Sequence, residues 1–106
     1  MSNVRDRIQT LIDANPVVLF MKGNRQQPMC GFSAAATNTL NEVLPEYHTV
    51  NVLDDDEVRQ GIKEYSNWPT IPQLYIGGEF IGGADILTEM FESGELQKII
   101  PQEALA

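Results

Sequence analysis

The sequence predicts one α/β domain covering residues 1–106, in which a four-stranded mixed sheet is flanked by helices. A chain of 106 residues has the size of one domain with its own core. Residues 16–21 form an apolar run without alternation, as expected of a strand buried on both faces. Segments with apolar residues at helical spacing lie on both sides of that run. A Gly77-Gly78 pair between two short apolar segments predicts a β-hairpin.

The first helix is expected before residue 15, because apolar residues recur there at helical spacing. These residues are Val4, Ile8, Leu11 and Ile12. Ser2 or Asn3 can cap the helix at its N-terminus, and Asn15-Pro16 ends it. The helix has one apolar face, which would cover the sheet. A polar loop over residues 22–29 follows the first strand.

A second helix is expected over residues 32–44, followed by a strand over residues 47–52. The apolar side of this helix would consist of Phe32, Ala36, Leu40, Val43 and Leu44. The acidic run at residues 54–56 can begin a third helix, because carboxylates stabilise helix N-termini. The apolar face of that helix would consist of Val58, Ile62 and Tyr65, despite the cost of Gly61 in its interior.

The C-terminal part combines the hairpin with a last helix. Residues 73–76 and 79–81 flank Gly77-Gly78, and Gly82-Gly83 ends the second strand. Asp85 can cap a helix that carries apolar residues and stops at Gly94, with a short helical tail through Ile100. A strand–helix–strand unit makes the first two strands parallel, and the hairpin adds an antiparallel pair.

Composition excludes several classes of function. The chain has 15 acidic and 7 basic residues and a net charge of −8, so a nucleic-acid partner is not expected. The sequence shows no secretory signal and no apolar stretch of the roughly 20 residues that span a bilayer. One cysteine rules out an internal disulfide and suits a reducing compartment. The chain is therefore expected to be a soluble, cytoplasmic protein without a membrane partner.

The single cysteine, Cys30, is the first candidate functional residue. It can be a small buried apolar residue, a nucleophile, or a metal ligand whose partners come from elsewhere. Its predicted position, between a loop and the start of a helix, favours a reactive thiol. The positive end of the helix dipole stabilises a thiolate over a thiol.

Other polar residues are weaker candidates. His48 is the only histidine and lies within a predicted strand, so a structural or surface role is favoured over a base for Cys30. The aspartates at 54–56 point in different directions on a helix and are not expected to bind a metal. A cysteine hydrolase and an aspartate metal site are therefore both disfavoured.

Two loops can bind a ligand through their backbones. In residues 68–72, Pro69 and Pro72 fix an extended entry into a strand. This segment is either a rigid loop or a place where Ile71 offers its backbone groups to an extended peptide. Gly82-Gly83-Ala84-Asp85 leaves free amides at a helix N-terminus, which suits an anion. Asp85 is either a cap or a partner for an ammonium group.

Together these motifs resemble the monothiol glutaredoxins that carry a Cys-Gly-Phe-Ser sequence. The motifs are Lys22-Gly23, Cys30-Gly31-Phe32-Ser33, residues 68–74 and Gly82-Gly83-Ala84-Asp85. Their order and spacing match that family over essentially the whole chain, residues 1–106. The resemblance implies a thioredoxin fold of the glutaredoxin type and glutathione binding. It also implies a [2Fe–2S] cluster that bridges a homodimer.

The resemblance also assigns roles to individual residues. Cys30 would be the catalytic thiol and the iron ligand. Lys22 and Arg59 would bind the glycine carboxylate of glutathione. Ile71, before a cis-Pro72, would pair its backbone with the cysteinyl unit, and Ala84 and Asp85 would hold the γ-glutamyl end. The implied glutathione-binding set is completed by Phe32, Thr70 and Gly83. Ala84 stands where the family often has Cys or Ser.

The resemblance implies an iron–sulfur carrier that acts in cluster transfer and iron homeostasis. Scaffold proteins, acceptor proteins and BolA-like proteins would be its partners. The number of cysteines agrees with a cluster shared by two chains, because a [2Fe–2S] cluster needs four ligands and each chain supplies one thiolate. Two chains and two glutathione thiols complete the set.

The alternative is a glutathione-dependent oxidoreductase that reduces protein–glutathione mixed disulfides through Cys30 alone, with weak activity. A third alternative, a purely structural interaction domain, leaves the co-occurrence of these motifs unexplained.

Overall fold

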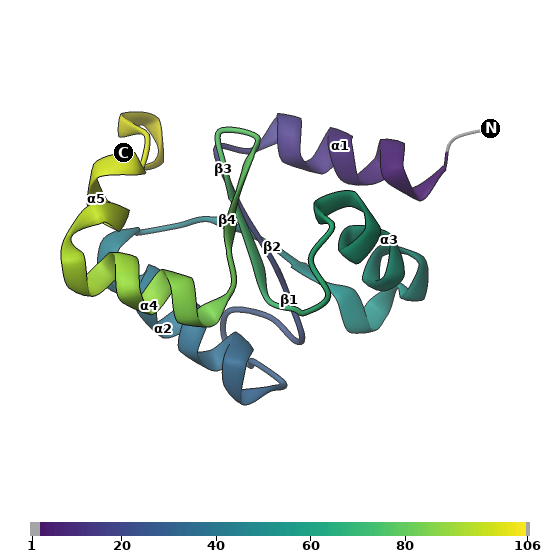
Figure 1. Ribbon diagram of the computed structural model, residues 1–106, viewed down its shortest axis with the longest axis horizontal. Helices are drawn as coiled ribbons and strands as arrows, with labels where there is room; N and C mark the ends of the chain where they lie inside the picture. The colour runs from purple at the N-terminus through teal and green to yellow at the C-terminus, as the bar shows by residue number, and fades with distance from the viewer. Residues whose placement is uncertain (1–2, 106) are drawn as a thin grey trace.

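The computed structural model describes residues 3–105 as a four-stranded sheet with helices on both faces (Figure 1). The strands lie in the order β2-β1-β3-β4. β1 is parallel to β2 and antiparallel to β3, and β3 is antiparallel to β4. The helices and strands are α1 Val4–Ala14, β1 Val17–Met21, α2 Gly31–Val43, β2 His48–Asn51, α3 Asp56–Ser66, β3 Gln73–Ile76, β4 Glu79–Gly82, α4 Ala84–Ser93 and α5 Glu95–Ile99, with 3-10 turns at Val52–Asp54 and Gln102–Leu105.

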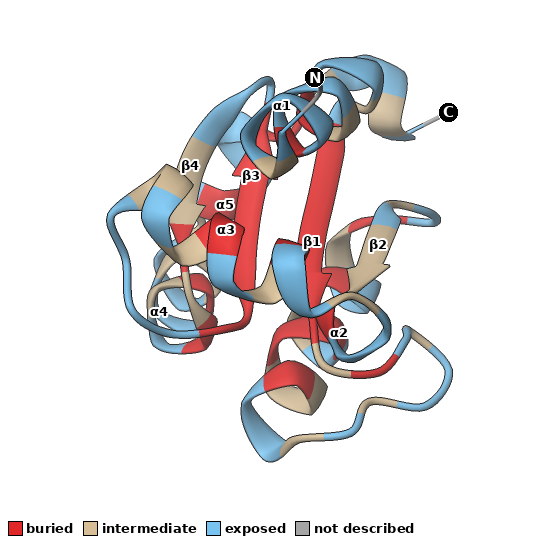
Figure 2. Cartoon of the chain, turned by 90° about the vertical axis from the view of Figure 1, so that its right-hand side faces the viewer, coloured by how far each residue is buried: buried red, intermediate tan, exposed pale blue. Residues whose placement is uncertain are grey.

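β1 is buried along its whole length (Figure 2), and its alternate side chains enter two separate cores. Val17, Leu19 and Met21 pack into a core with residues of α2, α4 and α5. Val18 and Phe20 pack into a second core with residues of α1 and α3. Because side chains of a strand alternate between faces, this one strand joins the two helical layers. The predicted strand buried on both faces is confirmed.

Capping residues and turn glycines predicted several ends of helices and strands correctly. The side chain of Asn3 accepts a hydrogen bond from the amide of Asp6 and caps α1, whereas Ser2 lies outside the described residues. Asp55 caps α3 by accepting from two amides of its first turn. Gly77 and Gly78 both have positive φ, as a two-residue hairpin turn requires. No helix among residues 3–105 is long and apolar enough to cross a membrane.

Several predicted boundaries differ from the structure by one residue, and two differences have a clear physical cause. The second strand ends at Asn51, because the Asn51 side chain accepts the amide of Leu53 and turns the chain into a 3-10 helix. The last helix is not capped by Asp85. The chain becomes helical at Ala84, so the extended residue at the N-cap is Gly83, and Asp85 lies in the first turn.

The predicted apolar side of α2 is also partly wrong. Phe32 is 64% exposed and lies outside the core. The buried residues of α2 are Ser33, Ala36, Thr37 and Leu40. Their stripe is centred near Ser33 and Leu40, and Phe32 falls about 100° away from that centre on the helix. Phe32 is therefore free to contribute to a surface site.

Gly61 lies inside α3 because α1 packs closely against it. A β-carbon at this position would lie 2.8 Å from Cγ1 of Val4 and 3.2 Å from Cδ1 of Ile8. A glycine in a helix interior costs about 1 kcal/mol relative to alanine. The close approach of the two helices explains why this cost is accepted here.

Candidate functional site

Cys30 lies at the N-cap of α2, beyond the C-terminal end of β1. Its backbone is extended and its carbonyl accepts the amide of Ala34, the first bond of the helix. The side chain is neither buried nor fully exposed, and it is a free thiol. The predicted position of Cys30 at a helix N-terminus is confirmed.

The surroundings of Cys30 favour the thiolate. Burial raises the pKa of the thiol, but this effect is outweighed. The amides of Ser33 and Phe32, the hydroxyl of Ser33 and the charge of Lys22 lower the pKa, so that the net pKa is below the ordinary value of 9.0. A larger share of Cys30 is therefore ionised at neutral pH than for a free cysteine.

Ser33 connects the cysteine to the preceding strand. Its side chain is fully buried, and Oγ accepts a hydrogen bond of 3.0 Å from the amide of Lys22. The same hydroxyl also lowers the pKa of Cys30. One side chain thus fixes the distance between the end of β1 and the thiol.

The polar loop between Lys22 and Cys30 is held in place by several hydrogen bonds. The amide of Met29 donates to the carbonyl of Lys22 at 2.8 Å, and Gly23 forms a bridge with Pro28. The amide of Gly23 donates to Oδ1 of Asn51 at 2.9 Å. A β-carbon on Gly23 would lie 2.4 Å from a backbone oxygen of the loop, so glycine is required at this position. The loop therefore presents Cys30 from a defined backbone.

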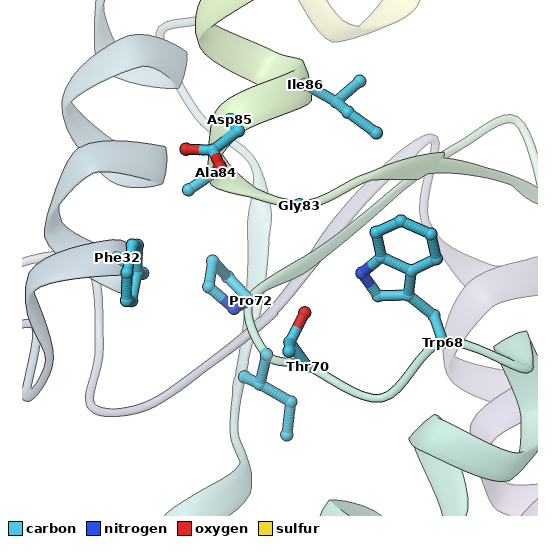
Figure 3. Close-up of a pocket in the computed structure, with 9 residues that line it drawn as sticks. Phe32, Trp68, Thr70, Pro72, Gly83, Ala84, Asp85 and Ile86 are labelled. Atoms are coloured by element: carbon cyan, nitrogen blue, oxygen red, sulfur yellow. The ribbon is translucent and has the colours of Figure 1, made fainter.

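The 68–72 loop lies beside the cysteine and contains a cis peptide bond between Ile71 and Pro72. Sequence reasoning from the residues alone left this bond open, whereas the family resemblance implied the cis form. Trp68 and Thr70 are exposed, whereas Ile71 and Pro72 are buried. The segment therefore combines a fixed backbone with the exposed side chains of Trp68 and Thr70, which Figure 3 draws as sticks.

The N-terminus of α4 faces the same loop. A β-carbon on Gly83 would lie 3.3 Å from the carbonyl oxygen of Pro72, so this residue is in close contact with the loop. Gly83 provides no side chain to cap α4. Asp85 is exposed in the first turn of α4, and its carboxylate lies above the loop in Figure 3. Helix amides and an accessible carboxylate thus occur together.

Two adjoining hollows surround these elements. The first, called the α4 hollow, has a volume of about 200 Å³ and is lined by Phe32, Trp68, Thr70, Ile71, Pro72, Gly83, Ala84, Asp85 and Ile86 (Figure 3). The second, called the lysine hollow, has a volume of about 260 Å³ and is lined by Lys22, Cys30, Phe32, Lys63, Pro69, Thr70 and Ile71. The hollows share Phe32, Thr70 and Ile71. Only together do they reach the roughly 300–1,000 Å³ of small-molecule sites, so a ligand would span both.

The structure therefore brings nearly all predicted site residues together. Arg59 is the exception, since it lines neither of the two hollows. Lys63 takes a place in the lysine hollow that sequence reasoning did not foresee. Arg59 and Lys63 are four residues apart on α3 and therefore share one helix face. This spacing is the sequence signal that could have identified Lys63 as a second candidate beside Arg59.

Trp68 and Ile86 line the α4 hollow although neither was predicted as a site residue. His48 lies at the far end of the sheet. It pairs with Val18 near the start of β1, whereas Cys30 follows the end of that strand. The expectation that His48 is not a base for Cys30 is consistent with this placement.

A cysteine at a helix N-terminus beside a cis-proline loop, on this mixed four-stranded sheet, defines a thiol protein of the thioredoxin fold. Comparison with known proteins identifies the family within this class of thiol proteins. Residues 17–81 match the family model for glutaredoxin. The chain belongs to the glutaredoxin family.

Several relatives of this chain are named as monothiol glutaredoxins. An uncharacterized monothiol glutaredoxin, ycf64, of Porphyra purpurea is 56% identical over 90 residues, covering 85% of this chain and 84% of the relative. The chloroplastic monothiol glutaredoxin-S14 of Arabidopsis thaliana is 53% identical over 95 residues, covering 90% of this chain and 55% of the relative. The solution structure of reduced apo GrxS14 from poplar has a TM-score of 0.78 and 46% identity, covering 90% of this chain and 87% of that one. The single cysteine of this chain agrees with the monothiol type.

Proposed function

We propose that this chain is a monothiol glutaredoxin that binds glutathione and carries a [2Fe–2S] cluster as cargo between proteins. The observation that supports it best is the position of Cys30 in a hollow that continues to the N-terminus of α4. Positive side chains lie beside the thiol, and a carboxylate with helix amides lies at the other end. A ligand that fits this arrangement carries a thiol, a negative group that faces the lysines, and a positive group that faces the carboxylate at α4.

Glutathione has this arrangement of charges. Its glycine carboxylate would lie near Lys22, with Arg59 or Lys63 as the second cation on α3. Its cysteinyl unit would pair with the backbone of Ile71 in the manner of strand addition. Its γ-glutamyl end carries an ammonium group for Asp85 and a carboxylate for the amides at Gly83 and Ala84. Phe32, Thr70 and Pro72 would enclose the middle of the ligand.

The donor set of the chain fits a cluster shared between two copies. No group of three or more His, Cys, Asp or Glu residues that could hold a metal occurs in the described part of the chain. Cys30 would thus contribute one thiolate, and a [2Fe–2S] cluster needs four ligands. A homodimer with two glutathione molecules provides all four. Such a cluster has two ligands that can exchange, which suits transfer.

The proposed carrier would receive the cluster from a scaffold protein and deliver it to acceptor proteins, with a BolA-like protein as a further partner. Iron homeostasis would depend on this transfer. We place the protein in the cytoplasm because its single cysteine suits a reducing compartment, whereas relatives include one named as chloroplastic and one named as mitochondrial.

Anaerobic reconstitution with iron, sulfide and glutathione tests the carrier function. The expected product is a glutathione-dependent chromophore that elutes as a dimer in gel filtration. Cys30→Ser is the matched control, and it should form no chromophore while its circular dichroism remains that of the wild type. A colourless wild-type monomer would exclude the homodimer, and a chromophore in Cys30→Ser would exclude Cys30 as the ligand.

A second candidate function is the reduction of protein–glutathione mixed disulfides, favoured by the lowered pKa of Cys30. The Cys30 thiolate would attack the glutathione sulfur of the mixed disulfide and release the protein thiolate. A second glutathione thiolate would then attack the Cys30–glutathione disulfide, which returns Cys30 and produces oxidised glutathione. Rapid turnover of a glutathionylated peptide by the cluster-free protein would support this function. Absence of turnover would leave the carrier as the only candidate of the two.

A further inference from the structure

Gln73 is a polar side chain in the core to which the proposed function assigns no role. It is the first residue of β3, follows Pro72 directly, and is fully buried. Nε2 donates to the carbonyl oxygens of Trp68 and Thr70, at 3.2 and 3.0 Å. Oε1 accepts from the hydroxyl of Tyr75 at 3.2 Å. Burying an amide costs free energy unless its groups are paired, and here both ends are paired.

These partners fix the direction of the amide. Backbone carbonyls can only accept, so the NH₂ group of Gln73 has to face Trp68 and Thr70. Burial raises the pKa of Tyr75 to about 12, so its hydroxyl is protonated at neutral pH and can donate to Oε1. The ring of Tyr75 packs against Phe20 and Phe80, with ring centroids 5.6 and 5.4 Å away, which restricts the position of the hydroxyl.

The bond to Thr70 also determines the direction of the next amide. Among the described residues only the Ile71-Pro72 bond is cis, so the peptide between Thr70 and Ile71 is trans. In a planar trans peptide the C=O and N–H groups point in opposite directions. With its oxygen directed at Gln73, this peptide turns the N–H of Ile71 to the other side of its plane. Ile71 itself lines both hollows.

We infer that Gln73 is a positioning residue, whose buried amide holds the 68–72 loop so that Ile71 offers its backbone to a bound peptide ligand. The inference rests on the proposed binding of glutathione and names a residue that prepares the site for it. An apolar side chain of similar size could fill the same space. It would leave the carbonyls of Trp68 and Thr70 without a donor, and the loop would be free to reorient.

A positioning role and a purely structural role predict different measurements. A structural role lowers the unfolding temperature of a variant without changing the affinity of the folded protein. A positioning role lowers the affinity of the folded protein and changes the surroundings of the loop before any ligand is present. Trp68 is the only tryptophan of the chain, so its fluorescence reports on the loop alone.

The test compares wild type, Gln73→Met and Tyr75→Phe, with S-methylglutathione as the ligand, because its blocked thiol cannot exchange with Cys30. Isothermal titration calorimetry should show about tenfold weaker binding for Gln73→Met, as expected when two hydrogen bonds that hold the binding conformation are lost. Its Trp68 emission should shift to the red and become more accessible to acrylamide. Tyr75→Phe keeps both amide donors and should stay within about threefold of the wild type.

Wild-type affinity and unchanged Trp68 emission in folded Gln73→Met would overturn the inference. If Gln73→Met does not fold, Gln73→Glu replaces it. This variant keeps the shape and the acceptor for Tyr75 but loses at least one donor, and unchanged affinity and emission there would overturn the inference equally. If the wild type itself does not bind S-methylglutathione, the proposed glutathione site fails. The fluorescence of Trp68 still tests in that case whether Gln73 holds the loop.

Discussion

Replacing Ser33 by alanine removes a buried hydroxyl group that serves two partners. Oγ of Ser33 accepts the amide of Lys22 at 3.0 Å and also lowers the pKa of Cys30. In Ser33→Ala the part-buried Lys22 amide loses its acceptor, which costs about 1–3 kcal/mol, while alanine improves helix propensity by about 0.5 kcal/mol. We expect the free energy of unfolding to fall by about 0.5–2.5 kcal/mol.

The same substitution should raise the pKa of Cys30, because one of the interactions that outweigh burial is lost. In the wild type the folded-state pKa lies below the ordinary value of 9.0, so the folded state binds fewer protons than the unfolded state. Cys30 therefore stabilises the fold increasingly as pH rises from the folded-state pKa to 9.0, and this contribution is lost as pH falls through the folded-state pKa. The gain should be smaller in Ser33→Ala and absent in Cys30→Ser.

Two measurements check this prediction. The pH dependence of Cys30 alkylation by iodoacetamide gives the thiol pKa, and urea unfolding at mildly acidic and alkaline pH gives the stability difference from Cys30→Ser. Thr37→Ala is the matched control, because Thr37 is buried in the same helix and donates to the carbonyl of Ala34. It should leave the alkylation profile unchanged. An identical alkylation midpoint in Ser33→Ala and wild type would refute the reasoning.

Two further substitutions test the packing and the charge of the site. Gly82→Ala should lower the free energy of unfolding by about 1–3 kcal/mol, as measured in urea, because overpacking forces neighbouring side chains to move. The new β-carbon would lie 2.8 Å from Cδ1 of Ile86, and wild-type stability would contradict this contact. Lys63→Gln should weaken glutathione binding severalfold and reduce its salt dependence, with exposed Lys98→Gln in α5 as the control. Unchanged affinity would indicate that Arg59 is the second cation.

The fold could be predicted from the sequence because its main signals are local. The apolar run at residues 16–21 does not alternate, so it can only be a strand covered on both faces or a segment of a buried helix, and its short length decides for the strand. Gly77 and Gly78 fix the hairpin turn and the pairing next to it, as far as the irregularity between Leu74 and Tyr75, where the register shifts. Helical spacing then places helices on both faces of the sheet. Each of these inferences depends on residues close to one another in the chain.

The site could be predicted only in part, because its members meet through contacts between distant segments. Phe32 has the spacing of a core residue, and only the position of the sheet relative to α2 shows that it is exposed. Arg59 and Lys63 have the same sign and lie on the same helix face, so the pattern does not say which one reaches the hollow. The role of Gln73 depends on carbonyl groups that carry no sequence signal.

The two candidate functions place opposite demands on the surface around Cys30. A reductase of mixed disulfides has to bind and release many protein chains, whereas a carrier has to cover its cargo with a second protein. Met29 and Phe32 lie near the thiol and are 60% and 64% exposed. Large apolar side chains gain about 25 cal/mol for each Å² removed from water, and such exposed patches mark interaction sites. The chain carries a net charge of −8, so these two apolar side chains offer a partner a contact beside Cys30 that does not depend on opposite charge, as the proposed carrier requires.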